Sequence, residues 1–287
     1  MESNKSFVKL FNLNVPVIEH LDYYLEQMSK TIKYKDIKYL KSLYDSEVIG
    51  IDNFLDFKNN KSREIIEFLK GTNAYNELLY DKSLIDYPTA KSIEYKEGVN
   101  YLSIDIKSAN FSALKRYDIP LNELGENYFE FLSKFTVPNV LIQSKYLRQF
   151  IFGNLNPKKI IKVQRNMIQE VVRNYQDHLQ VEGVKSDEVI FSFKNFSEIT
   201  DIFNEIDKSK YNVKIFSINR VEDFRIDNIY DIYGNMYHRE IMGVDGNLFY
   251  SKLKEYITKE PLDVKDLYFK INGRLAIIAT ENMKIEL

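Results

Sequence analysis

The stretch YLSIDIKSANFSALKR (residues 101–116) contains the transition on which the fold prediction depends. Positions Tyr101 to Ile104 alternate as in a half-buried strand, and the strand then reaches the carboxylate of Asp105. The residues after Asp105 take on helical spacing instead. A carboxylate at a strand end either caps a helix or serves as a ligand, and Ser108 and Asn110 offer the same capping chemistry. Asp105 is therefore a candidate functional residue.

Composition limits the class of protein. The chain has 287 residues, 44% of them hydrophobic and 14% aromatic, which is enough to build a core in one or two domains. Its 40 Lys and Arg nearly balance 42 Asp and Glu, so any basic surface must be local. The absence of Cys excludes disulfides, thiol nucleophiles and Cys-ligated zinc. No apolar run reaches the ~18–20 residues of a membrane span, so we expect a cytoplasmic protein of a reducing compartment, without a membrane partner.

Periodicity divides the chain into three regions. Residues 1–97 are mostly helical, 98–222 mix strands and helices, and 223–287 form a small α+β extension with hairpin turns at Gly234-Asn235 and Asn272-Gly273 around a helix at about 247–258. The middle region is close to the β-α-β-β-α-β order of a ferredoxin-like sheet, which predicts an α+β fold. Its expected elements are a strand at 99–106, helices at 109–117, 121–134, from about 145 and at 157–178, a strand pair at 179–193, a helix at 196–208 and a strand at 213–218.

A second acidic site lies in VKSDEVIFSF (residues 184–193). Asp187 and Glu188 begin a strand rich in Val, Ile and Phe, and alternation places Asp187 on the face of Val189 and Phe191. A plain turn-and-cap role is one interpretation. In a ferredoxin-like sheet, however, this strand lies beside the strand of Asp105. Two carboxylates at adjacent strand ends repel unless a cation lies between them, and oxygen ligands of this kind suit Mg²⁺ or Mn²⁺.

A basic helix is predicted between the two acidic sites. Asn156 caps it and Pro157 occupies its first turn. One polar stripe carries the cations Lys158, Lys162, Arg165 and Arg173 at helical spacing. Such a stripe is either a solvated face or a surface for phosphate groups, and its uniform sign favours nucleic acid. Lys145 and Arg148, on the preceding helical turn, are candidates for binding a triphosphate.

Taken together, these motifs resemble the palm domain of nucleic-acid polymerases, most nearly the family A DNA polymerases, with the compact spacing of reverse transcriptases. SIDIKSANFSALK is similar to the first motif, RQFIFG to the second, and SDEVIF to the third. The chain differs from the family in having Arg148 for Lys, Ser186 for His, and Asn110 where the family has the Glu that contacts the sugar. The similarity covers about residues 98–220.

The resemblance implies template-directed nucleotidyl transfer by a two-metal mechanism, with DNA or RNA and nucleoside triphosphates as partners. Asp105 and Asp187 would bind Mg²⁺ or Mn²⁺ and act as catalytic residues together with Glu188. Arg148, Lys145 and Asn110 would bind the nucleotide. Protein partners would supply the polymerase functions that this chain lacks, and residues 1–97 would serve as fingers, thumb or an accessory region.

Two other interpretations remain open at this stage. SDEVIF also resembles the Gly-Gly-Asp-Glu-Phe hairpin of nucleotidyl cyclases, although Lys185 and Ser186 replace the glycines. Alternatively, the chain is a palm-derived or unrelated α+β protein without catalysis, acting as a nucleic-acid-binding or structural subunit.

Overall fold

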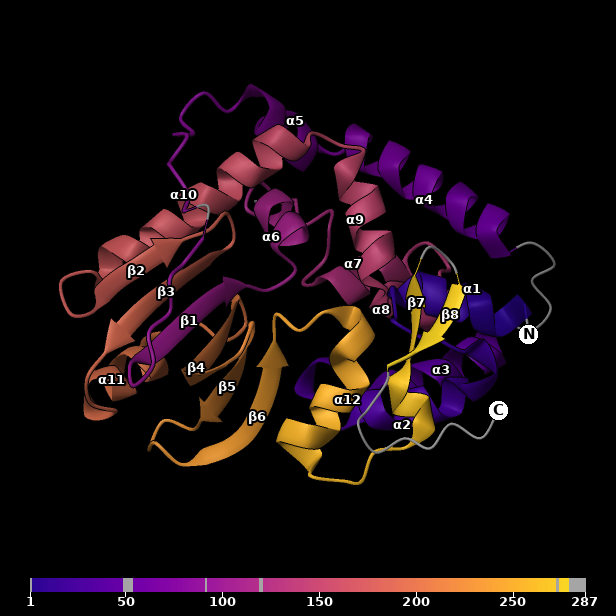
Figure 1. Cartoon of the computed structure of the whole chain (residues 1–287). Coiled ribbons are helices and arrows are strands. Elements are labelled where there is room, and N and C mark those ends of the chain that lie inside the picture. Colours follow the sequence, from indigo (N-terminus) through magenta and orange to yellow (C-terminus); the bar gives the residue numbers. More distant parts are fainter. Residues whose placement is uncertain (1, 49–53, 91, 119–120, 272–273, 279–287) are drawn as a thin grey trace. The chain divides into compact units, whose positions relative to one another are not determined.

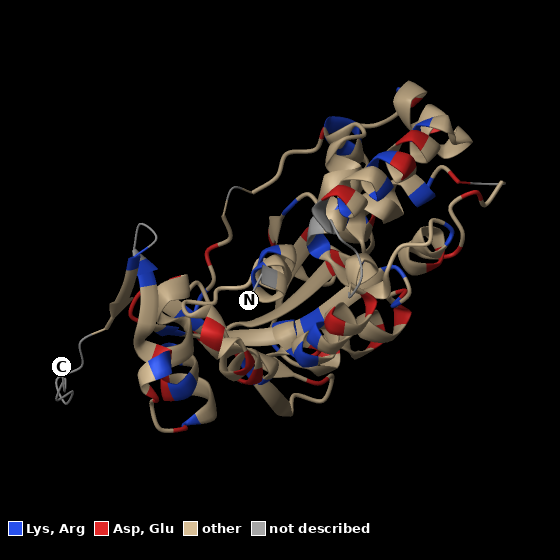
Figure 2. Ribbon diagram, turned by 90° about the vertical axis from the view of Figure 1, so that its right-hand side faces the viewer, with Lys and Arg blue, Asp and Glu red and all other residues tan. Residues whose placement is uncertain are grey.

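The computed structural model describes residues 2–48, 54–90, 92–118, 121–271 and 274–278. The chain divides into two compact units. Unit 1 comprises Met1–Ile49, Arg220–Asp227 and Arg239–Leu287, and unit 2 comprises Gly50–Asn219 and Asn228–His238. Lys and Arg are interspersed with Asp and Glu along the elements (Figure 2).

A six-stranded sheet forms the framework of the fold, in the order β2-β3-β1-β4-β5-β6 (Figure 1). The central strand β1 pairs antiparallel with β3 on one side and with β4 on the other. The predicted α+β class is confirmed. The strands are β1 (Asn100–Ile106), β2 (Gln180–Val184), β3 (Glu188–Phe193), β4 (Tyr211–Val221), β5 (Phe224–Tyr230) and β6 (Met236–Met242).

The helices of unit 2 largely follow the predicted order. α10 begins as expected, because the Asn156 side chain accepts a hydrogen bond from the Lys159 backbone N–H at 3.1 Å and Pro157 occupies the first turn. These helices are α4 (Phe54–Gly71), α5 (Asn73–Tyr80), α6 (Ala109–Lys115), α7 (Tyr128–Ser133), α8 (Asn139–Gln143), α9 (Lys145–Gly153), α10 (Pro157–Tyr175) and α11 (Ser197–Glu205).

Two stretches expected to be helical are not. The helix predicted at 121–134 begins only at Tyr128, because the buried carboxylate of Asp118 accepts the backbone N–H groups of Glu123 and Leu124 and holds a turn there. Residues 81–90 and 92–96 form neither helix nor strand. Some of their backbone groups bond to α10 and the sheet instead, as Ile85 does to Asn166 and Ala90 to Val184.

The two faces of the sheet differ in chemistry. Leu102, Ile104, Val189 and Phe191 lie on one face and are fully buried, and α10 packs against β3 and α6. The opposite face carries Ser103, Asp105 and Glu188 at its polar end. At the other end of that face, a cluster of buried side chains is covered by partly buried residues of the segment that precedes β1: the cluster is Tyr101, Ile190, Phe216 and Ile218, and the covering residues are Ile93, Tyr95 and Val99.

Unit 1 is built mainly from helices of both chain ends. Its helices are α1 (Glu2–Phe11), α2 (Leu21–Ser29), α3 (Ile37–Glu47) and α12 (Phe249–Leu253), with short turns at Ile18–His20, Ile32–Tyr34, Gly246–Leu248 and Val264–Leu267 and a π-helical turn at Lys254–Thr258. The strands β7 (Tyr268–Ile271) and β8 (Arg274–Ile277) pair antiparallel, as a hairpin does. The predicted turn residues Asn272-Gly273 lie outside the described residues.

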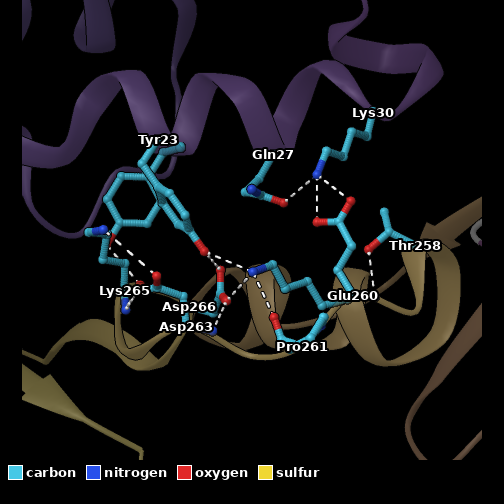
Figure 3. A network of polar contacts seen from close by, with 11 residues as sticks. Tyr23, Gln27, Lys30, Thr258, Glu260, Pro261, Asp263, Lys265 and Asp266 are labelled. Atoms are coloured by element: carbon cyan, nitrogen blue, oxygen red, sulfur yellow. Dashed lines mark hydrogen bonds and ion pairs between the residues drawn. The ribbon is translucent and has the colours of Figure 1, made fainter.

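A buried polar network joins α2 to residues 254–266 within unit 1 (Figure 3). The Lys254 ammonium lies 2.9 Å from an Asp266 carboxylate oxygen, and the two residues are 5% and 0% exposed. Tyr23 donates its hydroxyl hydrogen to Asp266 at 2.6 Å, while Lys254 also donates to the Tyr23 hydroxyl and the Pro261 carbonyl. Burial and this bond to Asp266 raise the pKa of Tyr23. The network satisfies a charge pair that would otherwise be costly to bury.

Candidate functional site

Asp105 lies at the polar end of the central strand β1. The register places it directly opposite Glu188 of β3 on one side and Asn212 of β4 on the other. The Asn212 amide donates to its carboxylate at 3.1 Å. The pKa of Asp105 is raised to about 6, mainly by burial; the neighbouring carboxylates Asp187 and Glu188 act in the same direction, while the Asn212 hydrogen bond and the Lys185 charge oppose the rise.

Asp187 is held beside the end of β1 by the backbone. Its carbonyl oxygen accepts the Ile106 N–H at 2.8 Å, and β3 begins one residue later. Asp187 therefore precedes the strand instead of starting it, and the residue that shares a face with Asp105 is Glu188. The structure brings the three predicted acids together at one end of the β1–β3 pair.

Glu188 is already engaged by neighbouring side chains. One carboxylate oxygen accepts a hydrogen bond from the Ser103 hydroxyl at 2.6 Å, and the other lies 2.6 Å from the Lys185 ammonium. Its charge is therefore balanced within the protein. Asp105, by contrast, accepts a hydrogen bond from the Asn212 amide and forms no ion pair with any described residue, although the charge of the nearby Lys185 acts on it.

The donor chemistry of this cluster suits a hard divalent cation. Two carboxylates supply part of an oxygen shell, which water and phosphate oxygens complete in typical Mg²⁺ sites. A cation would also relieve the repulsion that helps to raise the pKa of Asp105. Within the part of the chain that the structure describes, no group of three or more His, Asp or Glu is arranged to hold a metal. The acidic cluster is therefore not a complete metal site by itself, and the candidate ligands are Asp105 and Asp187 together with water and phosphate oxygens.

The predicted nucleotide-binding residues lie on α6 and α9. The Arg148 guanidinium sits over the ring of Tyr128, 5.7 Å from its centroid, and Lys145 is exposed at the start of α9. Asn110 accepts a hydrogen bond from the Gln164 amide of α10 at 2.8 Å. Among the described residues, none of these three predicted side chains forms a hydrogen bond or ion pair with Asp105. Their role toward a nucleotide stays a prediction.

The cationic stripe of α10 faces a segment of its own chain. Arg165 forms an ion pair with Asp86 at 2.6 Å and donates to the Tyr87 carbonyl at 3.3 Å, and Arg173 donates to the Tyr87 hydroxyl. Lys158 is exposed and Lys162 is half-buried on the same helix. The stripe predicted to face nucleic acid is therefore partly occupied by residues 86 and 87.

Sequence reasoning missed three residues that shape the acidic cluster: Ser103, Lys185 and Asn212. A signal existed for Lys185, which stands three residues before Glu188 across a tight turn. Ser103 is two positions from Asp105 and shares its face by alternation. Asn212 carries no local signal, because its position opposite Asp105 depends on the pairing of β4 with β1.

No protein-family model, curated protein or solved structure matches the chain. Of the helices in the described ranges, none has the length and apolar character needed to cross a membrane. Function must therefore be inferred from the acidic cluster and its surroundings.

Proposed function

We propose that unit 2 is a palm-like domain that carries out template-directed nucleotidyl transfer on DNA or RNA, with Mg²⁺ or Mn²⁺ held by Asp105 and Asp187. The observation that carries this proposal is the meeting of Asp105 and Asp187 at adjacent strand ends, with a raised pKa at Asp105. Such perturbed carboxylates are typical of functional sites.

The strand order supports the same proposal. The part β2-β3-β1-β4, with β1 antiparallel to both neighbours, is the order expected when a β-α-β-β-α-β chain forms a ferredoxin-like sheet. Polymerase palms use this arrangement to place one acid after the first strand and others on the central hairpin. A fold alone does not identify a function, so the proposal rests on the carboxylates.

Each residue of the cluster has a distinct role in this proposal. Asp105 and Asp187 bind the cation, and Asn212 orients the Asp105 carboxylate through its amide. Lys185 and Ser103 fix Glu188, which therefore supports the site instead of binding the cation directly. Arg148 pairs with the triphosphate, as guanidinium groups do well. A bound Mg²⁺ or Mn²⁺ supplies charge neutralisation at the phosphates and activation of a 3′-hydroxyl.

The test is primer extension with Mg²⁺ or Mn²⁺ by the wild type, Asp105→Asn and Asp187→Asn. We expect both variants to lose at least about 100-fold in rate, since removing one group that stabilises transition-state charge costs about 10²–10³. Asp177→Asn is the matched control, because it removes one exposed carboxylate outside the cluster and should leave the rate unchanged. Equal extension rates in all four proteins would refute the proposal.

Cation binding is measured separately by thermal shift. Mn²⁺ should raise the Tm of the wild type and of Asp177→Asn but not that of Asp105→Asn, because a ligand that binds only the folded state stabilises it. A single cyclic product formed from nucleotide alone would instead assign the cluster to a nucleotidyl cyclase.

A second candidate function is a non-catalytic nucleic-acid-binding or structural subunit. The observation that favours it is the engagement of Glu188 by Lys185 and Ser103, which leaves Asp105 and Asp187 as the two carboxylates of the cluster that form no ion pair with a described residue. Absence of extension with any primer, template or nucleotide, together with absence of a Mn²⁺ effect on Tm in a folded protein, would favour this candidate.

A further inference from the structure

Residues 81–87 run as an extended chain along the cationic side of α10, and we define them as the strap. Both the strap and α10 belong to unit 2. The Lys159 ammonium donates to the Asp81 carbonyl near the start of the helix, and Arg173 donates to the Tyr87 hydroxyl near its end. The contacts therefore advance along both segments in the same direction.

The backbone of the strap lies along the first half of α10. Its backbone contacts run from Lys159 at Asp81 to Arg165 at Tyr87, a rise of about 9 Å at 1.5 Å per residue. The Tyr87 side chain extends the contact to Arg173 through its hydroxyl. Asn166 holds the middle, because its amide accepts the Ile85 N–H at 3.3 Å and donates to the Ile85 carbonyl at 2.7 Å. The strap thus lies on α10 with its oxygen atoms facing cationic and amide donors.

The strap neutralises α10 incompletely. Asp86 is the one strap carboxylate that ion-pairs with the helix among the described residues, and its side chain is 67% exposed. The Asp81 carboxylate is turned to the Tyr117 hydroxyl instead. The Nε–H of Arg165 is buried and has no hydrogen-bond partner in the part of the chain that the structure describes. Arg165 therefore has donor capacity that the strap leaves unused.

We infer that the strap is an internal competitor for single-stranded nucleic acid, which binds the same side of α10 when the strap is displaced. The choice of nucleic acid as partner rests on the proposed function. A phosphodiester chain presents the oxygen acceptors that the strap now supplies, but with a full negative charge at every unit. The guanidinium of Arg165 pairs with a phosphate in a bidentate manner, which uses its idle Nε–H. Tyr80, 79% exposed at the end of α5, offers a ring on which a base stacks.

A strap held by exposed contacts is suited to displacement. The Arg165–Asp86 pair is partly exposed, with side-chain exposures of 25% and 67%, and such pairs contribute little in water. A nucleic acid brings several phosphate charges to α10 where the strap brings one carboxylate, so the electrostatic attraction favours the nucleic acid over the strap. The same competition lowers the affinity of α10 for weak or short anions. Only an anion that binds more tightly than the strap displaces it.

The first test measures binding of fluorescein-labelled oligo(dT) by anisotropy at fixed salt. Asp86→Asn should bind about 2- to 5-fold more tightly than the wild type, the gain that corresponds to losing one exposed ion pair. Glu94→Gln is the matched control, because it removes the same charge from an exposed position outside the strap and should not change affinity. Arg165→Ala should weaken binding and reduce its salt dependence.

A covalent lock gives the sharper test, because the chain has no Cys of its own. In Ile85→Cys/Asn166→Cys, oxidation joins the strap to α10, and the joined fraction is counted on a non-reducing gel. The oxidised protein should lose at least about 10-fold in oligo(dT) affinity, and dithiothreitol should restore it. Equal binding before and after reduction of a joined sample would overturn the inference. If the disulfide does not form, equal affinities of Asp86→Asn and Glu94→Gln overturn it instead.

The outcome is separable from that of the proposed function. If primer extension depends on Asp105 while oligo(dT) binding is unchanged in the strap variants, the result supports the proposed function and contradicts the role of the strap. Displacement of oligo(dT) by poly-glutamate at equal charge concentration would show that the side of α10 binds any acidic polymer, which overturns nucleic acid as its partner.

Discussion

Asp105 combines a central position in the sheet with an unfavourable charge. Its pKa of about 6 exceeds the ordinary value of 3.8 for an aspartate, so the folded state binds its proton more tightly than the unfolded state does. Burial is the main cause, and two neighbouring carboxylates act in the same direction. The ionised Asp105 carboxylate therefore lowers the free energy of unfolding at neutral pH. A carboxylate that only caps a helix would not have this effect.

Stability should fall as the pH rises through the window set by this residue. Between pH 4 and 6 the folded protein holds more protons than the unfolded one, so the free energy of unfolding decreases with pH and then levels off. The loss is up to about 3 kcal/mol for a shift of two units. Urea denaturation at pH 4.5 and 7.5 measures it. Asp105→Asn should flatten this dependence and be more stable than the wild type at pH 7.5.

The control for this prediction is again Asp177→Asn, which should keep the pH dependence of the wild type. A wild-type protein whose unfolding free energy rises between pH 4.5 and 7.5, in parallel with Asp105→Asn, would contradict the raised pKa. Saturating Mn²⁺ should restore much of the lost stability at pH 7.5 if the cation binds at Asp105.

The sequence identifies Asp105, Asp187 and Glu188 as candidate residues. It does not predict which of their charges is neutralised by a neighbouring side chain. Alternation gives the face of a side chain and not its partners across strands. The Lys185 and Ser103 contacts decide that Glu188 is neutralised, and Asn212 reaches Asp105 from a strand more than 100 residues away. These contacts exist only once the strands pair.

At the scale of elements, the edge strand β2 depends on a glycine. Ala90 donates its N–H to the Val184 carbonyl at 2.8 Å, and Ile93 lies against the open Cα of Gly183. A Cβ at Gly183 would stand 2.5 Å from Cγ1 of Ile93 and 2.9 Å from its Cδ1. The segment before β1 therefore fits β2 only because no side chain is present there.

Gly183→Ala should lower the free energy of unfolding by about 1–3 kcal/mol, the usual effect of overpacking. Urea denaturation measures it, with Gly153→Ala as the control, because a Cβ at Gly153 meets nothing within 4 Å. In an Ile93→Ala background the cost of Gly183→Ala should fall below about 1 kcal/mol, since the clashing atoms are gone. An undiminished cost in that background would show that backbone strain, not Ile93, is responsible.

Elements with strong local signals were predicted well, and those that depend on distant contacts were not. α10 has a cap, a first-turn Pro and an apolar face, so its start at residue 157 follows from its own residues. The segment 81–96 contains helix-forming Lys and Glu, yet Asn166, Arg165 and Val184 supply its backbone and side-chain partners. Tertiary contacts override propensity there.

At the scale of the whole molecule, unit 1 contains a buried ion pair between Lys254 and Asp266. Lys254→Met leaves a fully buried carboxylate without its cation, which should cost about 3–5 kcal/mol in the free energy of unfolding. Urea denaturation at pH 7 measures the loss. Lys30→Met, which breaks an exposed pair with Glu260, is the control and should cost no more than about 1 kcal/mol.

The double variant Lys254→Met/Asp266→Leu separates charge from packing. Replacing both partners with apolar groups should recover much of the loss, since a buried pair often contributes little beyond its own desolvation. A double variant as unstable as Lys254→Met would mean that the hydrogen bonds of Tyr23 and residue 263 to Asp266 matter more than the missing cation.

The way unit 1 is assembled from distant stretches has a consequence during synthesis. The ribosome makes α1 to α3 well before the partners of α2 at residues 250–266, which emerge only after residues 50–238 have been made. At 5–20 residues per second this interval lasts about 10–40 s. The nascent N-terminal helices must wait with an apolar face exposed, including Tyr24 and Met28, which are buried in the finished protein. The helices α1 to α3 are therefore made long before unit 1 can be completed, and a chaperone has that whole interval in which to bind them.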